Sequence, residues 1–250
     1  MRQKTSIFCL FLMANSMAIN AQFAKGDKMV GATIASIFFN SGNTDISTAS
    51  IGDVTSKITN YGISITPQIG WFVSDKIAIG ATLNINPNGQ KTTYQENGST
   101  YQSDKSNGFN IGFGGFVRSY FSGKSAWMPF GQLSLNGGIS NLKTDGFFYY
   151  KGGVPFYKYT YSGNSSGGSF VNAALDAGLT KMFGDNAGLD FFIGYNFAYN
   201  KTTFKKTTLY YLSASDINPS TGKNETTNKF TNHGFVLGLG FQVFLSGKKK

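Results

Sequence analysis

The sequence contains one cysteine, one histidine and two tryptophans in 250 residues. Cys9 lies in the apolar N-terminal stretch, so the rest of the chain has no thiol for a disulfide scaffold, a thiolate metal site or a cysteine nucleophile. A metal site would have to be built from carboxylates, and Asp plus Glu number only 12. We therefore expect no metal and no other cofactor.

Charge and long apolar runs are also scarce. Only 14% of the residues are charged, whereas soluble domains typically have roughly 25%. After residue 21 no stretch reaches the ~18 consecutive apolar residues of a transmembrane helix. Glycine and phenylalanine are abundant instead, at 32 and 24 residues. If the chain enters a membrane, it has to do so with strands.

The N-terminus has the features of a secretory signal peptide. Arg2 and Lys4 precede an apolar run, and "INA" ends at Ala21 as a small-residue cleavage site. We expect residues 1–21 to be removed and residues 22–250 to form one domain. The formal charge of +10 then falls by the two basic residues, 10 − 2 = +8. Anionic lipid headgroups or glycans suit this charge better than nucleic acid, for which no supporting motif is present.

An alternation of period two, which is typical of strands, runs through about eight segments. It is clearest in "GFVLGLGFQVFL", where the odd positions from Phe235 to Leu245 are bulky and apolar. The first segment does not keep one apolar parity, so its faces stay ambiguous. Pro67 lies inside the second and cannot donate a hydrogen bond, so a local bulge is predicted there. Apart from this C-terminal segment, the segments in chain order span residues 29–40, 61–73, 77–86, 108–121, 129–140, 170–183 and 188–200.

The connections alternate between short and long. Residues 74–76, 122–125 and 184–186 are predicted to be tight turns, and residues 41–60, 87–107, 141–169 and 201–229 long polar loops. Transmembrane barrels have short turns at one end and long extracellular loops at the other. The predicted fold is an all-β, eight-stranded antiparallel up-and-down transmembrane β-barrel.

The composition of the polar face decides which face is outside. A water-exposed surface would carry charge at about 25–35% of positions, but this face is Gly, Asn, Ser, Thr and Gln with three clear charges, Arg118, Asp176 and Asp190. It is therefore expected to line the lumen, with the apolar face toward lipid. A soluble lipocalin-like barrel or sandwich is the alternative. Aromatic residues near the strand ends predict two interfacial belts, among them Trp71, Trp127, Phe121 and Tyr199.

The lumen charges are the main candidates for a site. Arg118 and Asp190 lie at similar depth near the short-turn ends of the fourth and seventh strands. We expect them to pair across the narrow lumen, alone or together with Asp176, because a charge there is disfavoured unless it is paired. Such a network plugs the lumen. The alternative is a selectivity ring in a channel.

On these features the sequence resembles the small bacterial outer-membrane β-barrels of OmpA/OmpX type, within the porin-like barrels. The resemblance covers about residues 28–245 and rests on the signal peptide, the eight segments, "GFGGFVRSYF" with Arg118, and "FQVFL". It implies the outer membrane of a Gram-negative cell, contact with outer-membrane lipid and lipopolysaccharide, and insertion by the barrel assembly machinery. One departure is that "SGKKK" follows Leu245, whereas such chains usually end on an aromatic residue.

The function expected is structural or adhesive, at the cell surface and non-enzymatic, with the basic loops binding a glycan or protein. The natural contact points are Lys143, Lys151, Lys158, Lys205 and Lys206. A small-solute porin and a lipid-modifying enzyme are the alternatives. The enzyme would use His233, the single histidine, but no serine or carboxylate stands at a useful spacing from it.

Overall fold

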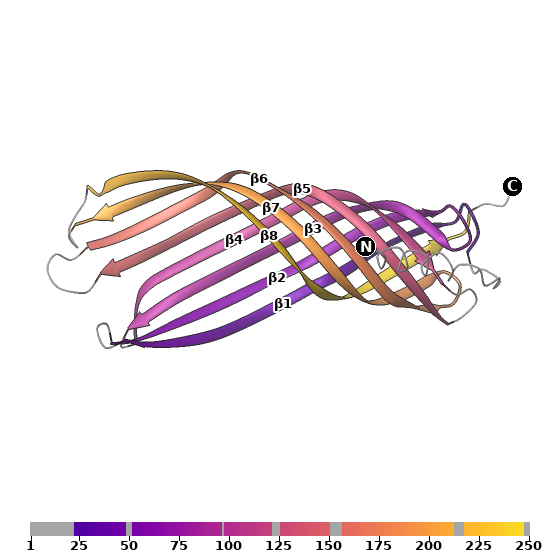
Figure 1. Cartoon of the computed structure of the whole chain (residues 1–250), viewed down its shortest axis with the longest axis horizontal. Helices are drawn as coiled ribbons and strands as arrows, with labels where there is room; N and C mark the ends of the chain where they lie inside the picture. The colour runs from indigo at the N-terminus through magenta and orange to yellow at the C-terminus, as the bar shows by residue number, and fades with distance from the viewer. Residues whose placement is uncertain are drawn as a thin grey trace, which may run out of the picture.

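The chain forms a closed antiparallel β-barrel (Figure 1). The computed structural model describes residues 23–48, 52–96, 98–121, 126–150, 157–212 and 218–247. The predicted eight-stranded up-and-down topology is confirmed, while the expected signal peptide lies outside the described residues. In the described ranges no helix is long and apolar enough to cross a bilayer. The strands are β1 (Lys28–Thr48), β2 (Gly52–Phe72), β3 (Ile77–Glu96), β4 (Ser99–Tyr120), β5 (Trp127–Tyr150), β6 (Tyr157–Phe183), β7 (Ala187–Tyr211) and β8 (Ser220–Leu245).

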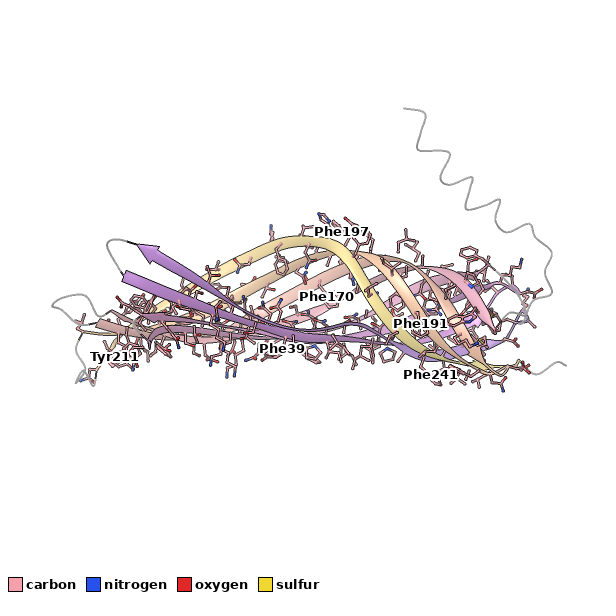
Figure 2. All side chains as sticks on the ribbon, turned by 90° about the horizontal axis from the view of Figure 1, so that it is seen from below. Phe39, Phe170, Phe191, Phe197, Tyr211 and Phe241 are labelled. Atoms are coloured by element: carbon pink, nitrogen blue, oxygen red, sulfur yellow. The ribbon has the colours of Figure 1, made fainter. Side chains whose placement is uncertain are left out.

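The apolar rows face outward, as the composition predicts. Phe113 and Leu237 are 73% and 76% exposed, whereas Thr180 and Gln242 on the polar face are fully buried. Phe191 and Phe241, labelled in Figure 2, belong to the outward rows. Each row is apolar for about ten residues, which at ~3.3 Å per residue and ~40° tilt gives a band of about 25 Å. That height matches the hydrocarbon layer of an outer membrane.

Tight turns define one end of the barrel, the short-turn end. The Ser74 hydroxyl accepts hydrogen bonds from the backbone N–H groups of Lys76 and Ile77, and Gly184 adopts a φ of 66° that favours glycine. Trp71 and Trp127 lie here, 43% and 46% exposed.

The remaining belt residues lie where the sequence places them. Phe121 follows β4 at the short-turn end, and Tyr199, 37% exposed, lies at the opposite margin of the apolar band. The Lys181 Nζ is 5.1 Å from the Trp127 ring centroid, so this lysine extends along an aromatic surface toward the headgroups.

The long loops predicted from sequence are mostly strand, and that expectation is wrong. The β7–β8 ladder, for example, continues to Tyr210↔Ser220. Beyond the membrane both faces of a hairpin meet water, so no contrast between apolar and polar faces marks the strands. Thr and Tyr nevertheless have a high propensity for extended structure. We call this end of the molecule the hairpin end.

The ambiguous faces of the first strand have a structural cause. The β1–β2 register shifts between Ile34 and Ser36, so Ala35 is an extra residue in β1. The outward residues have even numbers before the bulge, as at Ile34, and odd numbers after it, as at Ile37 and Phe39. A bulge reverses parity in just this way.

The bulge predicted at Pro67 is wrong. Pro67 lies opposite Ala32 in an unbroken stretch of the β1–β2 register. The β2–β3 ladder also keeps its register across the proline, from Ile65↔Ile85 to Gln68↔Thr82. The sheet therefore accommodates the missing donor without an extra residue.

Closure of the barrel is confined to the short-turn end. β1 and β8 pair from Lys28↔Leu245 to Ile34↔Leu239 and no further, although both strands are described throughout. Beyond these pairs they form the edges of an open trough, and Figure 1 shows them at opposite margins of the hairpin end. We call this opening the seam. It begins at the Ala35 bulge, where the added twist turns β1 away from β8.

Replacing an outward residue at the middle of the apolar band tests the orientation of the faces. Phe113→Lys should lower the free energy of unfolding in lipid vesicles by about 2–4 kcal/mol, because a lysine at the midplane has to leave water. Denaturant titration monitored by heat-dependent gel mobility measures the change. Phe113→Leu is the control and should stay close to wild type. Equal stability of the two variants would show that this face meets water.

Candidate functional site

A buried ion pair crosses the lumen near the short-turn end. The Arg118 Nη1 lies 2.7 Å from the Asp190 Oδ2, and the two side chains are 1% and 0% exposed. Asp190 also accepts hydrogen bonds from the Thr180 hydroxyl, 2.6 Å, and the Gln242 amide, 3.1 Å. The structure thus brings together the two charges whose pairing the sequence predicts.

Arg118 is held on its remaining sides as well. Its Nε donates to the Gln132 Oε1 at 2.7 Å, and its Nη1 also donates to the Tyr120 hydroxyl at 3.2 Å. The guanidinium carbon lies 4.2 Å from the centroid of the Phe130 ring, a cation–π contact. Five strands therefore fix one arginine. β4 supplies Arg118 and Tyr120, β5 supplies Gln132 and Phe130, and β7 supplies Asp190, which Thr180 of β6 and Gln242 of β8 hold in place.

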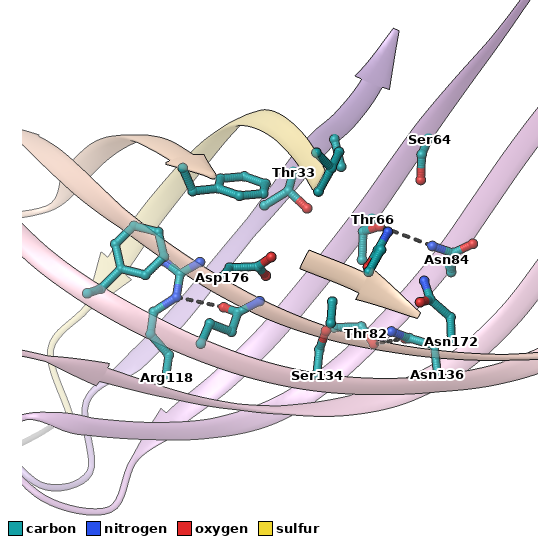
Figure 3. Close-up of a pocket in the computed structure, with 17 residues that line it drawn as sticks. Thr33, Ser64, Thr66, Thr82, Asn84, Arg118, Ser134, Asn136, Asn172 and Asp176 are labelled. Carbon is teal, nitrogen blue, oxygen red and sulfur yellow. Dashed lines mark hydrogen bonds between the residues drawn. The ribbon is translucent and has the colours of Figure 1, made fainter. Parts of the chain in front are cut away.

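Asp176 does not join this pair directly. It lines a cavity of about 60 Å³ that begins above Arg118 and continues between Asn136 and Asn172. Figure 3 shows Asp176 beside Arg118 in this cavity. Among the described residues the ion-pair partner of Arg118 is Asp190. The expected network is therefore a pair, with Asp176 above it.

An apolar layer lies below the ion pair and completes the floor of the lumen. The Phe23 ring stacks on Phe72 at 4.3 Å between centroids and contacts Phe244 at 4.6 Å and Tyr120 at 5.1 Å. Met29, Met128 and Met182 fill the rest of the layer. The side chains of this floor are almost fully buried.

Asp27 fixes the chain ends beneath this layer. Its Oδ2 accepts from the Ala24 N–H and its Oδ1 from the Gly247 N–H, both at 2.8 Å. This part of the floor could not be predicted from the strand pattern, because Phe23 and Asp27 precede the first strand. The one signal in the sequence was that Phe72 and Phe244 occupy positions of the alternation that face the lumen.

The lumen above the floor is lined by uncharged amides. Two connected hollows of about 370 and 590 Å³ widen toward the hairpin end, and their described lining contains no Asp, Glu, Lys or Arg. We call them together the asparagine vestibule. Neighbouring amides bond one another, with Asn60 donating to Asn40 at 3.0 Å and Asn88 to Asn86 at 2.9 Å. Its asparagines include Asn40, Asn60, Asn86, Asn88, Asn110, Asn141, Asn200 and Asn232.

The lysines expected to make surface contacts are of two kinds. Lys143 and Lys205 lie 3.9 Å from Asp145 and 3.8 Å from Glu225, and all four side chains are exposed. Lys151 lies outside the described residues. The Lys206 Nζ is 3.6 Å from the Tyr161 ring centroid, and the Lys158 Nζ is 5.0 Å from Tyr149 and 5.4 Å from Tyr211. These two lysines therefore lie on aromatic rings that orient them.

The single histidine lies at the margin of the apolar band. The His233 Nδ1 is 2.6 Å from the Tyr195 hydroxyl on the neighbouring strand β7. Within the described ranges no group of three or more His, Cys, Asp or Glu residues is arranged to hold a metal ion.

Comparisons with known proteins concern the fold. No family model matches the chain, and no curated protein matches it. Among solved structures it is similar to the outer membrane protein OprG from Pseudomonas aeruginosa, at 14% identity over 91% of this chain and 100% of that one, with a TM-score of 0.39. It is also similar to a major outer membrane protein from Thermus thermophilus, at 12% identity over 88% and 99%, TM-score 0.36. The third is the outer membrane protease OmpT from Escherichia coli, at 10% identity over 93% and 100%, TM-score 0.36.

The physical grounds for the assignment are in the chain itself. It has a closed base, an apolar belt of membrane height and a polar lumen. The chain has the fold of a bacterial outer-membrane β-barrel. Its strand number and the inward Arg118 agree with the resemblance seen in the sequence.

Breaking the lumen ion pair tests its structural role. Arg118→Glu places a second carboxylate beside Asp190 with no cation nearby, so we expect a loss of about 3–5 kcal/mol in the free energy of unfolding. The double variant Arg118→Leu with Asp190→Leu removes both charges and should recover most of that loss. Denaturant unfolding in lipid vesicles measures both. A fully stable Arg118→Glu barrel would contradict the pairing.

Proposed function

We propose that the protein is a non-enzymatic outer-membrane barrel that binds surface glycans or proteins through its hairpins. The observation that carries this proposal is the length of the strands. The outward apolar row of β8 ends at Phe235, yet β8 stays paired with β7 as far as Ser220. At ~3.3 Å per residue and ~40° tilt, the remaining strand rises about 38 Å beyond the hydrocarbon. A wall of this height is more than the membrane anchor needs.

The chemistry of the hairpins favours an anionic partner such as lipopolysaccharide. Lysines outnumber acidic residues when the four hairpin segments, residues 41–60, 87–107, 141–169 and 201–229, are taken together. Lys158 and Lys206 rest on tyrosine rings, which keeps their charges in place without neutralising them. Tyrosine adds rigid contact area with both apolar and hydrogen-bonding character.

The floor is the argument against a small-solute porin. An ion or sugar leaving the vestibule would have to pass the Arg118–Asp190 pair and then the layer around Phe23.

Substituting the ring-supported lysines tests the binding role. Lys158→Gln with Lys206→Gln should weaken binding to lipopolysaccharide-containing vesicles by about 2 kcal/mol, at about 1 kcal/mol per lysine near an anionic surface. Vesicle co-sedimentation at low and high salt measures the change, and the difference should shrink with salt. Lys143→Gln with Lys205→Gln is the matched control, because carboxylates already lie beside those lysines. Equal losses in both pairs would contradict a specific role for the ring-supported lysines.

Conductance separates the binding role from the porin. The wild-type barrel should be silent in planar bilayers. Phe23→Ala with Phe244→Ala removes two rings of the lower layer and, combined with Arg118→Leu and Asp190→Leu, should give measurable channels. Steady conductance from the wild-type barrel would favour the porin instead.

A further inference from the structure

The seam opens inside the apolar band. Ile37 and Phe39 on β1 are 74% and 75% exposed, and Phe235 and Leu237 on β8 are 81% and 76% exposed. These four residues belong to the outward apolar rows, yet they lie beyond the last β1–β8 pair, Ile34↔Leu239. Two unpaired strand edges therefore face each other at the depth of the acyl chains.

Unpaired edges at this depth need hydrogen-bonding partners. Each edge has four unpaired residues at this depth. The N–H and C=O groups of successive residues point alternately to the two sides of a strand, so the two edges together direct roughly four N–H and four C=O groups into the gap. An unsatisfied backbone group in hydrocarbon is costly. Acyl chains supply no partner, whereas hydroxyl groups both donate and accept.

The asparagine vestibule reaches the seam from inside. The hollow of about 370 Å³ is bounded by Gly234, Phe235 and Val236 of the free β8 edge, with Asn196 and Asn200 of β7 beside them. Phe235 faces outward and Val236 inward, so the residues that bound this hollow include both faces of the free β8 edge. Figure 3 shows the polar wall immediately below it, with Asn84, Asn136 and Asn172 directed into the lumen.

The vestibule suits an uncharged, polyhydroxylated group. Its described lining has no Asp, Glu, Lys or Arg to pair with a phosphate, its titratable side chain His233 is bonded through Nδ1 to Tyr195, and Arg118 below is already paired with Asp190. Carboxamides keep spare capacity, since Asn60 uses one of its two donors on Asn40. Phe230 adds an aromatic ring that is 52% exposed at the same wall.

We propose that the vestibule binds the headgroup of a neutral glycolipid, whose acyl chains leave through the seam into the bilayer. The sugar hydroxyls bond the asparagine amides and the free edges of β1 and β8. The chains pass between Ile37 and Leu237 and lie against Phe39 and Phe235. This site is separate from the hairpin surface and does not depend on what the hairpins bind.

The register of the two edges defines a variant that closes the site. If Ala35 and Ser36 together oppose Gly238, then Ile37 faces Leu237 and Phe39 faces Phe235, and outward residues stay opposite outward residues. Cysteine is confined to Cys9 in the N-terminal stretch. Oxidation of Ile37→Cys with Leu237→Cys is therefore expected to trap the two edges when they come together in this register, through one disulfide across the seam. Val117→Cys with Leu133→Cys, an outward pair of β4 and β5 that is already opposed, is the matched control.

The test uses the full barrel in nanodiscs of phosphatidylcholine containing a neutral diglycosyl diacylglycerol. Native mass spectrometry after mild extraction counts the lipids retained. Wild type and the oxidised control should retain the glycolipid in preference to phosphatidylcholine, and the reduced seam variant is the reference for its own oxidised form. Oxidation of the seam variant should lower that retention about tenfold, as expected when several hydrogen bonds are lost, and reduction should restore it.

A second pair of variants tests the vestibule without a disulfide. Asn232→Leu should lower glycolipid retention by about fivefold through lost hydrogen bonds, whereas Asn228→Leu, farther along β8, should not. The proposal is overturned by unchanged retention in the oxidised seam variant or in Asn232→Leu. Equal retention of phosphatidylcholine overturns it too, as does a seam disulfide that joins two copies. Loss of lipopolysaccharide binding by the hairpins would leave it intact.

Discussion

The structure depends on one constraint, which is that a backbone group in hydrocarbon has to be hydrogen-bonded within the protein. Seven of the eight strand junctions meet it by long antiparallel ladders, and the eighth, between β1 and β8, meets it over a short stretch at the base. The apolar rows, the tight turns and the aromatic belts all follow from closing such a sheet in lipid. Among the described strands the seam between β1 and β8 leaves this constraint open at the depth of the acyl chains, and it is where we propose that a glycolipid binds.

The floor shows how a narrow lumen accommodates charge. Arg118 is acceptable at 1% exposure because Asp190 neutralises it and because Gln132 and Tyr120 each accept a further N–H group. The apolar layer beneath keeps water from the pair and so strengthens it. Phe23 closes that layer from outside the strands, which makes the segment before β1 part of the barrel core.

Above the floor the lumen changes from charged and tight to neutral and open. Asparagine lines it where side chains from opposite strands no longer meet, so amides bond their neighbours and keep spare donors and acceptors. A barrel with a closed floor and an open, uncharged vestibule is suited to holding a molecule rather than passing one. The fold alone does not choose a ligand, and the proposals therefore rest on the lining of the vestibule and the lysines of the hairpins.

The sequence by itself determined the strand number, the outward face, the short turns at residues 74–76 and 184–186 and the approach of Arg118 to Asp190, because period-two patterning and sparse charge can be read directly from it. The predicted turn at residues 122–125 lies outside the described residues. The sequence failed where the register and the edges of neighbouring strands decide. The bulge lies at Ala35 instead of Pro67, since two neighbouring ladders set the register. The hairpin segments are strands because hydrogen bonds to the neighbouring strand, not burial of apolar side chains, keep them extended. The seam is a relation between the first and last strands, while the vestibule and the position of Phe23 depend on strands all round the barrel, and only the closed barrel brings these parts together.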